Sequence, residues 1–154
     1  ALEHDAGLVA CCAERLDAVG AGGAAEALLQ AELKQAWNPR LVDLYGRVRG
    51  DDAARQAKTA ATWARSRGDD ALLALARGRI AQRRERFEEA RDHYAASLAL
   101  RETPEACAEL GRLEARLGNG ERGADLLERA LELRAPPFTE LPLPAASGAL
   151  ERAS

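Results

Sequence analysis

The dipeptide Gly-Arg occurs at three points along the chain with an almost constant spacing. The copies are Gly46-Arg47, Gly78-Arg79 and Gly111-Arg112, which lie 32 and 33 residues apart. Self-similarity at a period of 20 to 50 residues is typical of repeat proteins in which short helical units stack on their neighbours. The spacing therefore predicts a helical repeat fold, a class of structure that binds other molecules more often than it catalyses reactions.

The composition favours closely packed helices and almost no strand. Hydrophobic residues make up 47% of the 154 residues, but alanine supplies much of this and aromatic residues only 4%. Alanine is the best helix former and its small side chain lets helices approach closely. The formal net charge is -3, which argues against nucleic acid as a partner, because such proteins neutralise phosphates with an excess of basic residues.

Apolar periodicity and capping residues predict four antiparallel helix pairs. Asn38-Pro39, one of the two residues Asp51 and Asp52, one of Asp69 and Asp70, and Thr103-Pro104 are typical helix starts, while Gly68 is a typical end. The expected helices cover residues 2–19, 24–37, 41–48, 53–67, 71–84, 87–100, 104–117 and 121–134.

Small residues recur where paired helices must cross. Gly78 and Ala90 in the third pair, and Gly111 and Gly123 in the fourth, match the small positions of the tetratricopeptide repeat. The chain therefore resembles that family, which implies an all-α, tetratricopeptide-like right-handed superhelix of about four antiparallel helix pairs over residues 1–134. Arg77 departs from the pattern and the second pair is too short for a standard repeat. The alternative is an irregular helical bundle in which the Gly-Arg recurrence is accidental.

The resemblance implies a role for the recurring arginines. In tetratricopeptide folds the position of Arg47, Arg79 and Arg112 faces a concave groove, where guanidinium groups suit carboxylates or phosphates. The alternative is that these side chains are solvated or paired with acidic residues of the chain, namely Asp43, Glu109 or Glu114. The predicted groove for a protein partner consists of Arg40, Arg47, Arg79, Arg83, Arg112 and Arg116.

Catalytic and metal-binding patterns are absent from the sequence. The two histidines, His4 and His93, have no partner at the spacing of zinc ligands. The run 20–25 matches a dinucleotide-binding fingerprint, but the residues before it have helical rather than strand periodicity. Cys12 and Cys107 fall at positions that belong to the core. We therefore expect no enzyme activity, no catalytic residues, no metal and no cofactor. An odd number of cysteines, two of them adjacent, favours reduced thiols and a cytoplasmic location.

Two blocks of sequence resemble a more specific family. Residues 37–46 (WNPRLVDLYG) and the later stretches 95–101, 103–106 and 109–112 are similar to the C-terminal region of HemY-type tetratricopeptide proteins of haem biosynthesis. The resemblance implies two transmembrane helices upstream, absent from this chain, and a domain at the bacterial inner membrane facing the cytoplasm. It also implies a scaffold for enzymes of late protohaem synthesis.

Two functions remain open at this stage. The groove binds a helix or an extended segment of a partner enzyme, or it binds porphyrin or haem directly, with propionates on arginines and His93 or a cysteine as axial ligand. Residues 135–154 contain Pro136-Pro137 and alternate leucine with proline, so they are either disordered or cover the apolar end of the last pair. The apolar ends of the stack also allow a homodimer.

Overall fold

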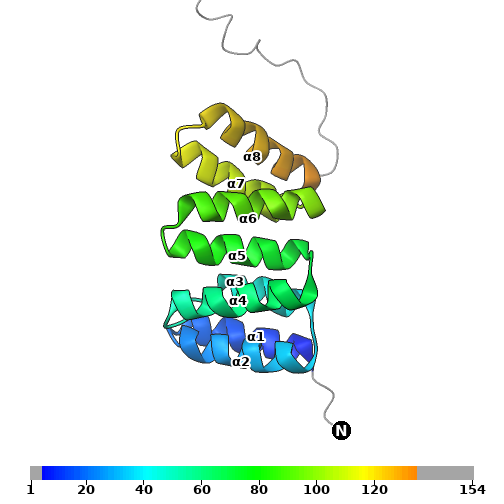
Figure 1. The fold of residues 1–154 in the computed structure, drawn as a ribbon. Helices are drawn as coiled ribbons and strands as arrows, with labels where there is room; N and C mark the ends of the chain where they lie inside the picture. The colour runs from blue at the N-terminus through cyan, green and yellow to red at the C-terminus, as the bar shows by residue number, and fades with distance from the viewer. Residues whose placement is uncertain (1–4, 135–154) are drawn as a thin grey trace, which may run out of the picture.

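The computed structural model describes residues 5–134, and every regular element within this range is an α-helix (Figure 1). The predicted all-α class is confirmed, and each predicted helix is present: those at 53–67 and 87–100 have the predicted bounds, and the others differ at one or both ends by one to four residues. The run 20–25 follows a helix rather than a strand, so a dinucleotide-binding βαβ unit is absent here. The helices are α1 (Ala6–Ala18), α2 (Gly22–Gln35), α3 (Pro39–Arg47), α4 (Ala53–Arg67), α5 (Ala71–Arg83), α6 (Phe87–Leu100), α7 (Pro104–Arg116) and α8 (Gly120–Arg134).

The predicted capping residues set the helix starts. The Asn38 side chain accepts hydrogen bonds from the backbone N–H groups of the first turn of α3, with Pro39 following it. Asp52, Asp70 and Thr103 cap α4, α5 and α7 in the same way. Each cap satisfies backbone donors that have no partner inside the helix, which favours a helix start at that residue.

The helices follow one another along a single direction, from α1 and α2 at one end to α7 and α8 at the other (Figure 1). Within pairs, α1 packs on α2, α5 on α6 and α7 on α8. Between consecutive pairs, α3 packs on α1, α2 and α5, while α5 packs also on α4, and α7 on α6. Neighbouring pairs therefore bury each other's apolar faces.

The glycine of each Gly-Arg copy lies at a close contact between helices. A Cβ atom on Gly46 would lie 2.5 Å from the Cα of Ala76 on α5, and one on Gly78 would meet the ring of Tyr94 on α6. A Cβ on Gly111 would lie 3.0 Å from the carbonyl oxygen of Gly123 on α8. Only glycine permits these approaches without displacing a neighbour, so the recurrence of this residue has a packing cause.

The second pair is built differently from the others. Large side chains join α3 to α4: the buried Gln56 amide donates to the carbonyl oxygens of Tyr45, at 2.7 Å, and Val48, at 3.3 Å. The ring of Trp63 packs against the rings of Tyr45 and Trp37. The distances between ring centroids are 4.7 Å to Tyr45 and 5.5 Å to Trp37. These side chains fill the space that small residues close in the third and fourth pairs.

One core prediction is wrong. Cys107 is buried as expected, but Cys12 is exposed. Cys12 shares a face of α1 with Leu8 and Val19, which are 62% and 78% exposed. α1 packs mainly on α2 and α3, and within the described residues this face of α1 is exposed.

No helix within residues 5–134 is long and apolar enough to cross a bilayer. The interpretation of residues 135–154 as disordered or as a cap lies outside the described residues.

Candidate functional site

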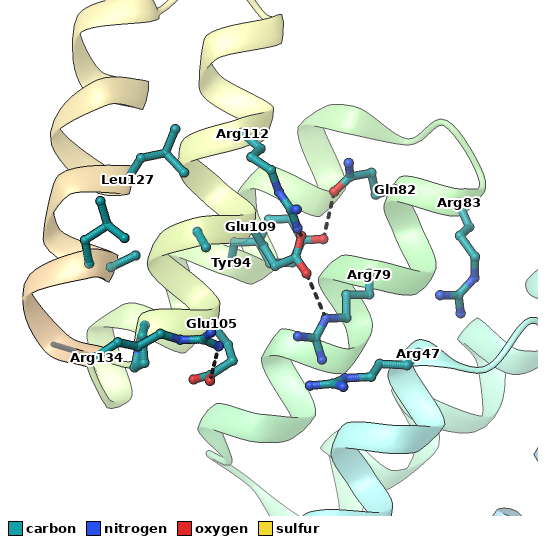
Figure 2. Close-up of a pocket in the computed structure, with 14 residues that line it drawn as sticks. Arg47, Arg79, Gln82, Arg83, Tyr94, Glu105, Glu109, Arg112, Leu127 and Arg134 are labelled. Atoms are coloured by element: carbon teal, nitrogen blue, oxygen red, sulfur yellow. Dashed lines mark hydrogen bonds and ion pairs between the residues drawn. The ribbon is translucent and has the colours of Figure 1, made fainter. Parts of the chain in front are cut away.

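A groove with a volume of about 750 Å³ crosses α3, α5, α7 and α8 (Figure 2). We call it the arginine groove because five guanidinium groups line it, those of Arg47, Arg79, Arg83, Arg112 and Arg134. The apolar part of the lining comes from α7 and α8, which also carry Arg112 and Arg134. It consists of Ala108, Leu127, Ala130 and Leu131.

The structure brings together four of the six arginines predicted for the partner site, namely Arg47, Arg79, Arg83 and Arg112. Arg116 lines a neighbouring depression that shares Arg112 and Leu127 with the groove. Arg40 is exposed in the first turn of α3 and lines neither hollow. Two of the six predicted arginines, Arg40 and Arg116, therefore lie outside the groove.

A chain of alternating charges crosses the groove. Arg79 contacts Asp43 on α3, with Nη1 2.7 Å from Oδ1, and Glu109 on α7, with Nε 3.2 Å from Oε1. Arg47 contacts the other oxygen of Asp43 at 3.1 Å, and Arg112 contacts the other oxygen of Glu109 at 2.6 Å. We call these five residues the charge ladder, because they alternate in sign across three helices.

The arginines of the ladder are paired with acidic residues, as one of the two sequence interpretations expected, but they are not equivalent. The side chain of Arg79 is only 10% exposed and lies between two carboxylates. Arg47 and Arg112 are 53% and 64% exposed. Because a guanidinium has five N–H donors, these two outer arginines keep donors that face solvent and can contact a ligand.

Arg83 holds helices together at the edge of the groove. Its Nη1 donates to the carbonyl oxygen of Gly46 at 2.7 Å, and its Nη2 donates to Gln56 Oε1 at 3.3 Å. Burial lowers the pKa of Arg83 from its usual value, although the group remains cationic at neutral pH. Arg83 therefore contributes to the packing of α5 against α3 and α4.

A neutral hydrogen bond forms part of the floor. Tyr94 donates its hydroxyl hydrogen to Gln82 Oε1 at 2.8 Å (Figure 2). Burial, followed by the nearby charge of Glu109, raises the pKa of Tyr94 well above its usual value. The phenol stays protonated at neutral pH and adds no charge to the groove.

Sequence reasoning missed the contribution of the second helix of the last pair. Arg134 in the last turn of α8 lies at one end of the groove, where its Nη2 is 2.9 Å from Glu105 Oε1 (Figure 2). Leu127 and Leu131 face the same hollow. The prediction followed only the first helix of each pair, whereas the apolar periodicity of α8 was the signal that could have found this wall.

The groove carries an excess of positive charge. Its five arginines face Glu105 and Glu109 in the lining and Asp43 behind it. The sum is +2, because the five cations oppose three carboxylates. An occupant with one or two acidic groups and apolar side chains complements this combination of walls.

The residues suggested as haem ligands do not meet at the groove. His93 on α6 lies outside the lining, 17% exposed, with Nε2 3.6 Å from Glu89 Oε1. Burial, helped by the positive charge of Arg77, lowers the pKa of His93. Cys107 is buried, and Cys11 and Cys12 lie on α1. Within residues 5–134 no three histidine, cysteine or acidic residues are grouped to hold a metal ion.

Comparison with family models finds no matching family, and comparison with curated proteins finds no match.

Proposed function

We propose that this chain is a tetratricopeptide-like domain that binds a segment of a partner protein in the arginine groove and performs no catalysis. The four helix pairs would form one right-handed superhelix with the first helices of the pairs along its inner wall. The Gly-Arg spacing, the contacts between consecutive pairs and the close approaches at Gly46, Gly78 and Gly111 support this arrangement.

The observation that carries the proposal is the chemistry of the groove. It joins an apolar wall on α8 to exposed guanidinium groups on α3 and α7. Extended or helical peptides bind such grooves through apolar anchors, while charged groups at the rim determine orientation and exclude wrong partners. The partner segment is therefore apolar with acidic residues.

The wider biological role follows the sequence resemblance. A HemY-type protein would hold this domain on the cytoplasmic side of the bacterial inner membrane, where its partners would be enzymes of late haem biosynthesis. The similarity of residues 37–46 to that family supports this assignment. A homodimer through the apolar ends of the stack remains part of the proposal.

Affinity capture with charge reversals tests the binding role. The double variant Arg47→Glu, Arg112→Glu changes the two exposed arginines of the charge ladder and leaves Arg79 in place. We expect about a 10-fold loss of the captured partner, because two attractive contacts become repulsive. Captured proteins from a membrane extract are identified and quantified by mass spectrometry.

A matched control separates the groove from general charge effects. Lys58→Glu with Arg65→Glu makes the same change of charge on α4, where both residues are exposed and neither lines the groove. Capture by this control should equal that of the unchanged protein. Equal capture by the groove variant and the control would remove the groove from the account.

A further inference from the structure

A second hollow adjoins the arginine groove along α7. Its volume is about 740 Å³, and it shares four lining residues with the groove, which are Gln82, Glu109, Arg112 and Leu127 (Figure 2). Because the two spaces have these side chains in common, they meet along one edge. We call the groove and the second hollow together the α7 trough.

One face of α7 lines the trough over most of the length of the helix. The lining residues on this face are Glu105, Ala108, Glu109, Arg112 and Arg116. Residues three and four positions apart lie on the same side of a helix. From Glu105 to Arg116 the helix rises about 16 Å, at about 1.5 Å per residue. The trough is therefore long enough to hold about three turns of another helix.

Both ends of the trough are apolar. At one end Leu131 of α8 is 60% exposed beside Ala130. At the other end Phe87 of α6 and Leu117, which follows α7, line the second hollow and are 42% and 37% exposed. Apolar surface that stays in contact with water favours an occupant that covers it. An occupant of the trough therefore gains from an apolar side chain at each end.

Contacts between α7 and α8 show how these ends are separated. Arg134 near the end of α8 pairs with Glu105 near the start of α7, at 2.9 Å. Further along, a Cβ atom on Gly111 would lie 3.0 Å from the Cγ atom of Leu127. Residue numbers thus fall along α8 as they rise along α7, and the two helices are antiparallel.

This arrangement gives the distance between the apolar ends. Leu131 lies one turn beyond Leu127 on α8, about 6 Å towards the start of α7. Leu117 lies six residues beyond Gly111 on α7, about 9 Å in the opposite direction. The two apolar ends are therefore about 15 Å apart along the trough.

An arginine without an acidic partner lies near the second end. Arg116 is exposed, and among residues 5–134 no carboxylate pairs with it, whereas Arg112, one turn earlier on the same face, pairs with Glu109. With Arg116 the trough has six arginines against three carboxylates, a sum of +3. An acidic residue of an occupant can bind Arg116 without displacing an existing ion pair.

The helical walls favour an occupant that is itself a helix. An extended segment needs backbone partners for its own N–H and C=O groups, but those of α7 and α8 are hydrogen-bonded within each helix. A helical segment satisfies its own backbone groups. Positions eleven apart on a helix share a face and lie about 16 Å apart, which matches the separation of the two apolar ends.

We propose that the α7 trough is one binding site for an amphipathic helix of the partner, about three turns long. One apolar residue of that helix contacts Leu131, a second one, eleven positions away, enters the space between Phe87 and Leu117, and an acidic residue near the second pairs with Arg116. Because the trough contains the arginine groove, this inference rests on the proposed function and adds the conformation and length of the bound segment.

Selection from a library of helical peptides tests the inference on the complete 154-residue chain. The peptides are about four turns long, and the positions of one face carry leucine, alanine, glutamate or lysine in every combination. We expect enriched peptides to have leucines eleven positions apart, with a glutamate within one turn of one of them. An enriched peptide is then synthesised with a fluorescent label, and fluorescence anisotropy measures its dissociation constant.

Substitutions at the two ends separate the second hollow from the arginine groove. Arg116→Glu and Phe87→Ala change the second hollow, while Leu131→Asp changes the groove. Each should raise the dissociation constant about 10-fold, because each removes one contact of the bound helix. Arg101→Glu is the matched control: Arg101 is exposed at the end of α6 and lines neither hollow, so its dissociation constant should equal that of the unchanged protein.

Three results would overturn the inference. The first is a failure to enrich peptides with the expected spacing. The second is binding that depends on Leu131 but not on Arg116 or Phe87, and the third is binding that depends only on the second hollow.

The proposed function has a separate readout. Loss of partner capture in the Arg47→Glu, Arg112→Glu variant, combined with the first or second result, would leave the proposed function standing without this inference. Unchanged capture in that variant, together with unchanged peptide binding in Leu131→Asp, would remove the arginine groove and the proposed function with it.

Discussion

At the scale of single residues, the two members of the Gly-Arg dipeptide have separate tasks. The glycine lets a neighbouring helix approach, as Gly46 does for Ala76, and the arginine beside it lines the groove. The recurrence is visible in the sequence, and the sequence analysis predicted correctly that each copy lies in a helix. It left open whether the arginines were free or paired, because Arg79 meets Asp43 and Glu109 from positions 36 and 30 residues away, and such distant pairs depend on how the helices stack.

Replacing Arg79 tests its place in the charge ladder. Arg79→Ala removes the cation between two carboxylates that are only 22% and 20% exposed. We expect a loss of about 2 kcal/mol in the free energy of unfolding, since Asp43 and Glu109 lose a partly buried partner. Urea unfolding followed by circular dichroism measures it.

The exposed end of the ladder supplies the control for that substitution. Arg112 is 64% exposed, so Arg112→Ala should cost only about 0.5 kcal/mol. Equal losses for the two variants would contradict the view that Arg79 is the structural member of the ladder.

Glu114 predicts a dependence of stability on pH. Its side chain is fully buried and accepts from Arg91 Nε at 2.7 Å and Asn119 Nδ2 at 2.5 Å. Burial alone would raise the pKa of Glu114, but these hydrogen bonds and the charge of Arg91 hold it below its usual value. A carboxyl group with a lowered pKa in the folded state stabilises the fold above its ordinary pKa of about 4.3 and loses this contribution as the pH falls through the folded value.

The variant Glu114→Gln isolates this contribution. Its stability deficit relative to the unchanged protein should be largest above about pH 5 and should shrink as the pH falls below about 4. Urea unfolding at several pH values measures the difference. A deficit that stays constant from pH 6 to pH 3 would show that ionised Glu114 does not contribute in this way.

At the scale of elements, the helices could be predicted well because their signals are local. Asn38, Asp52, Asp70 and Thr103 each start a helix, and Gly68 with its positive φ of 76° ends one. Each of these residues acts on backbone groups within a few positions of itself. Helix ends can therefore be predicted from the sequence more accurately than the contacts between helices.

The errors concern which face of a helix has a partner. The match to the tetratricopeptide pattern placed Cys12 of α1 in the core, but Cys12 is exposed. For the groove, the prediction omitted Arg134 and the leucines of α8, and it included Arg40 and Arg116, which lie outside the lining. A periodic pattern identifies an apolar face, whereas the packing of neighbouring elements decides whether that face becomes core, groove or open surface.

The contact between α3 and α5 predicts the effect of filling a glycine. Gly46→Ala adds a Cβ 2.5 Å from the Cα of Ala76, so the helices must move apart. Alanine gains about 1 kcal/mol in helix propensity over glycine, but overpacking typically costs 1–3 kcal/mol. We expect a net destabilisation of about 1 kcal/mol or more, measured by thermal or urea unfolding.

Gly120 offers the matched control for that substitution. It is the first residue of α8, and an added Cβ there meets nothing within 4 Å. Gly120→Ala should be neutral or slightly stabilising. If Gly46→Ala proved as well tolerated as Gly120→Ala, the close approach of α3 and α5 would not be a constraint on the fold.

At the scale of the whole molecule, the stack explains how distant parts of the sequence build one surface. One core cluster extends from α1 to α5 and a second from α5 to α8, so α5 belongs to both. The arginine groove lies over this junction, with α3 on one side and α7 and α8 on the other (Figure 2). Its shape therefore depends on how consecutive pairs pack, and a bound segment would contact three of the four pairs.

A footprint of the bound partner on this protein tests the binding role most directly. Hydrogen–deuterium exchange is measured on the chain alone and in complex with the partner recovered by affinity capture. The account predicts added protection in α5, α7 and α8, at the segments that carry Arg79, Arg112 and Leu131, with α4 unchanged. Protection concentrated on α2 and α4, with the groove segments exchanging as before, would contradict it.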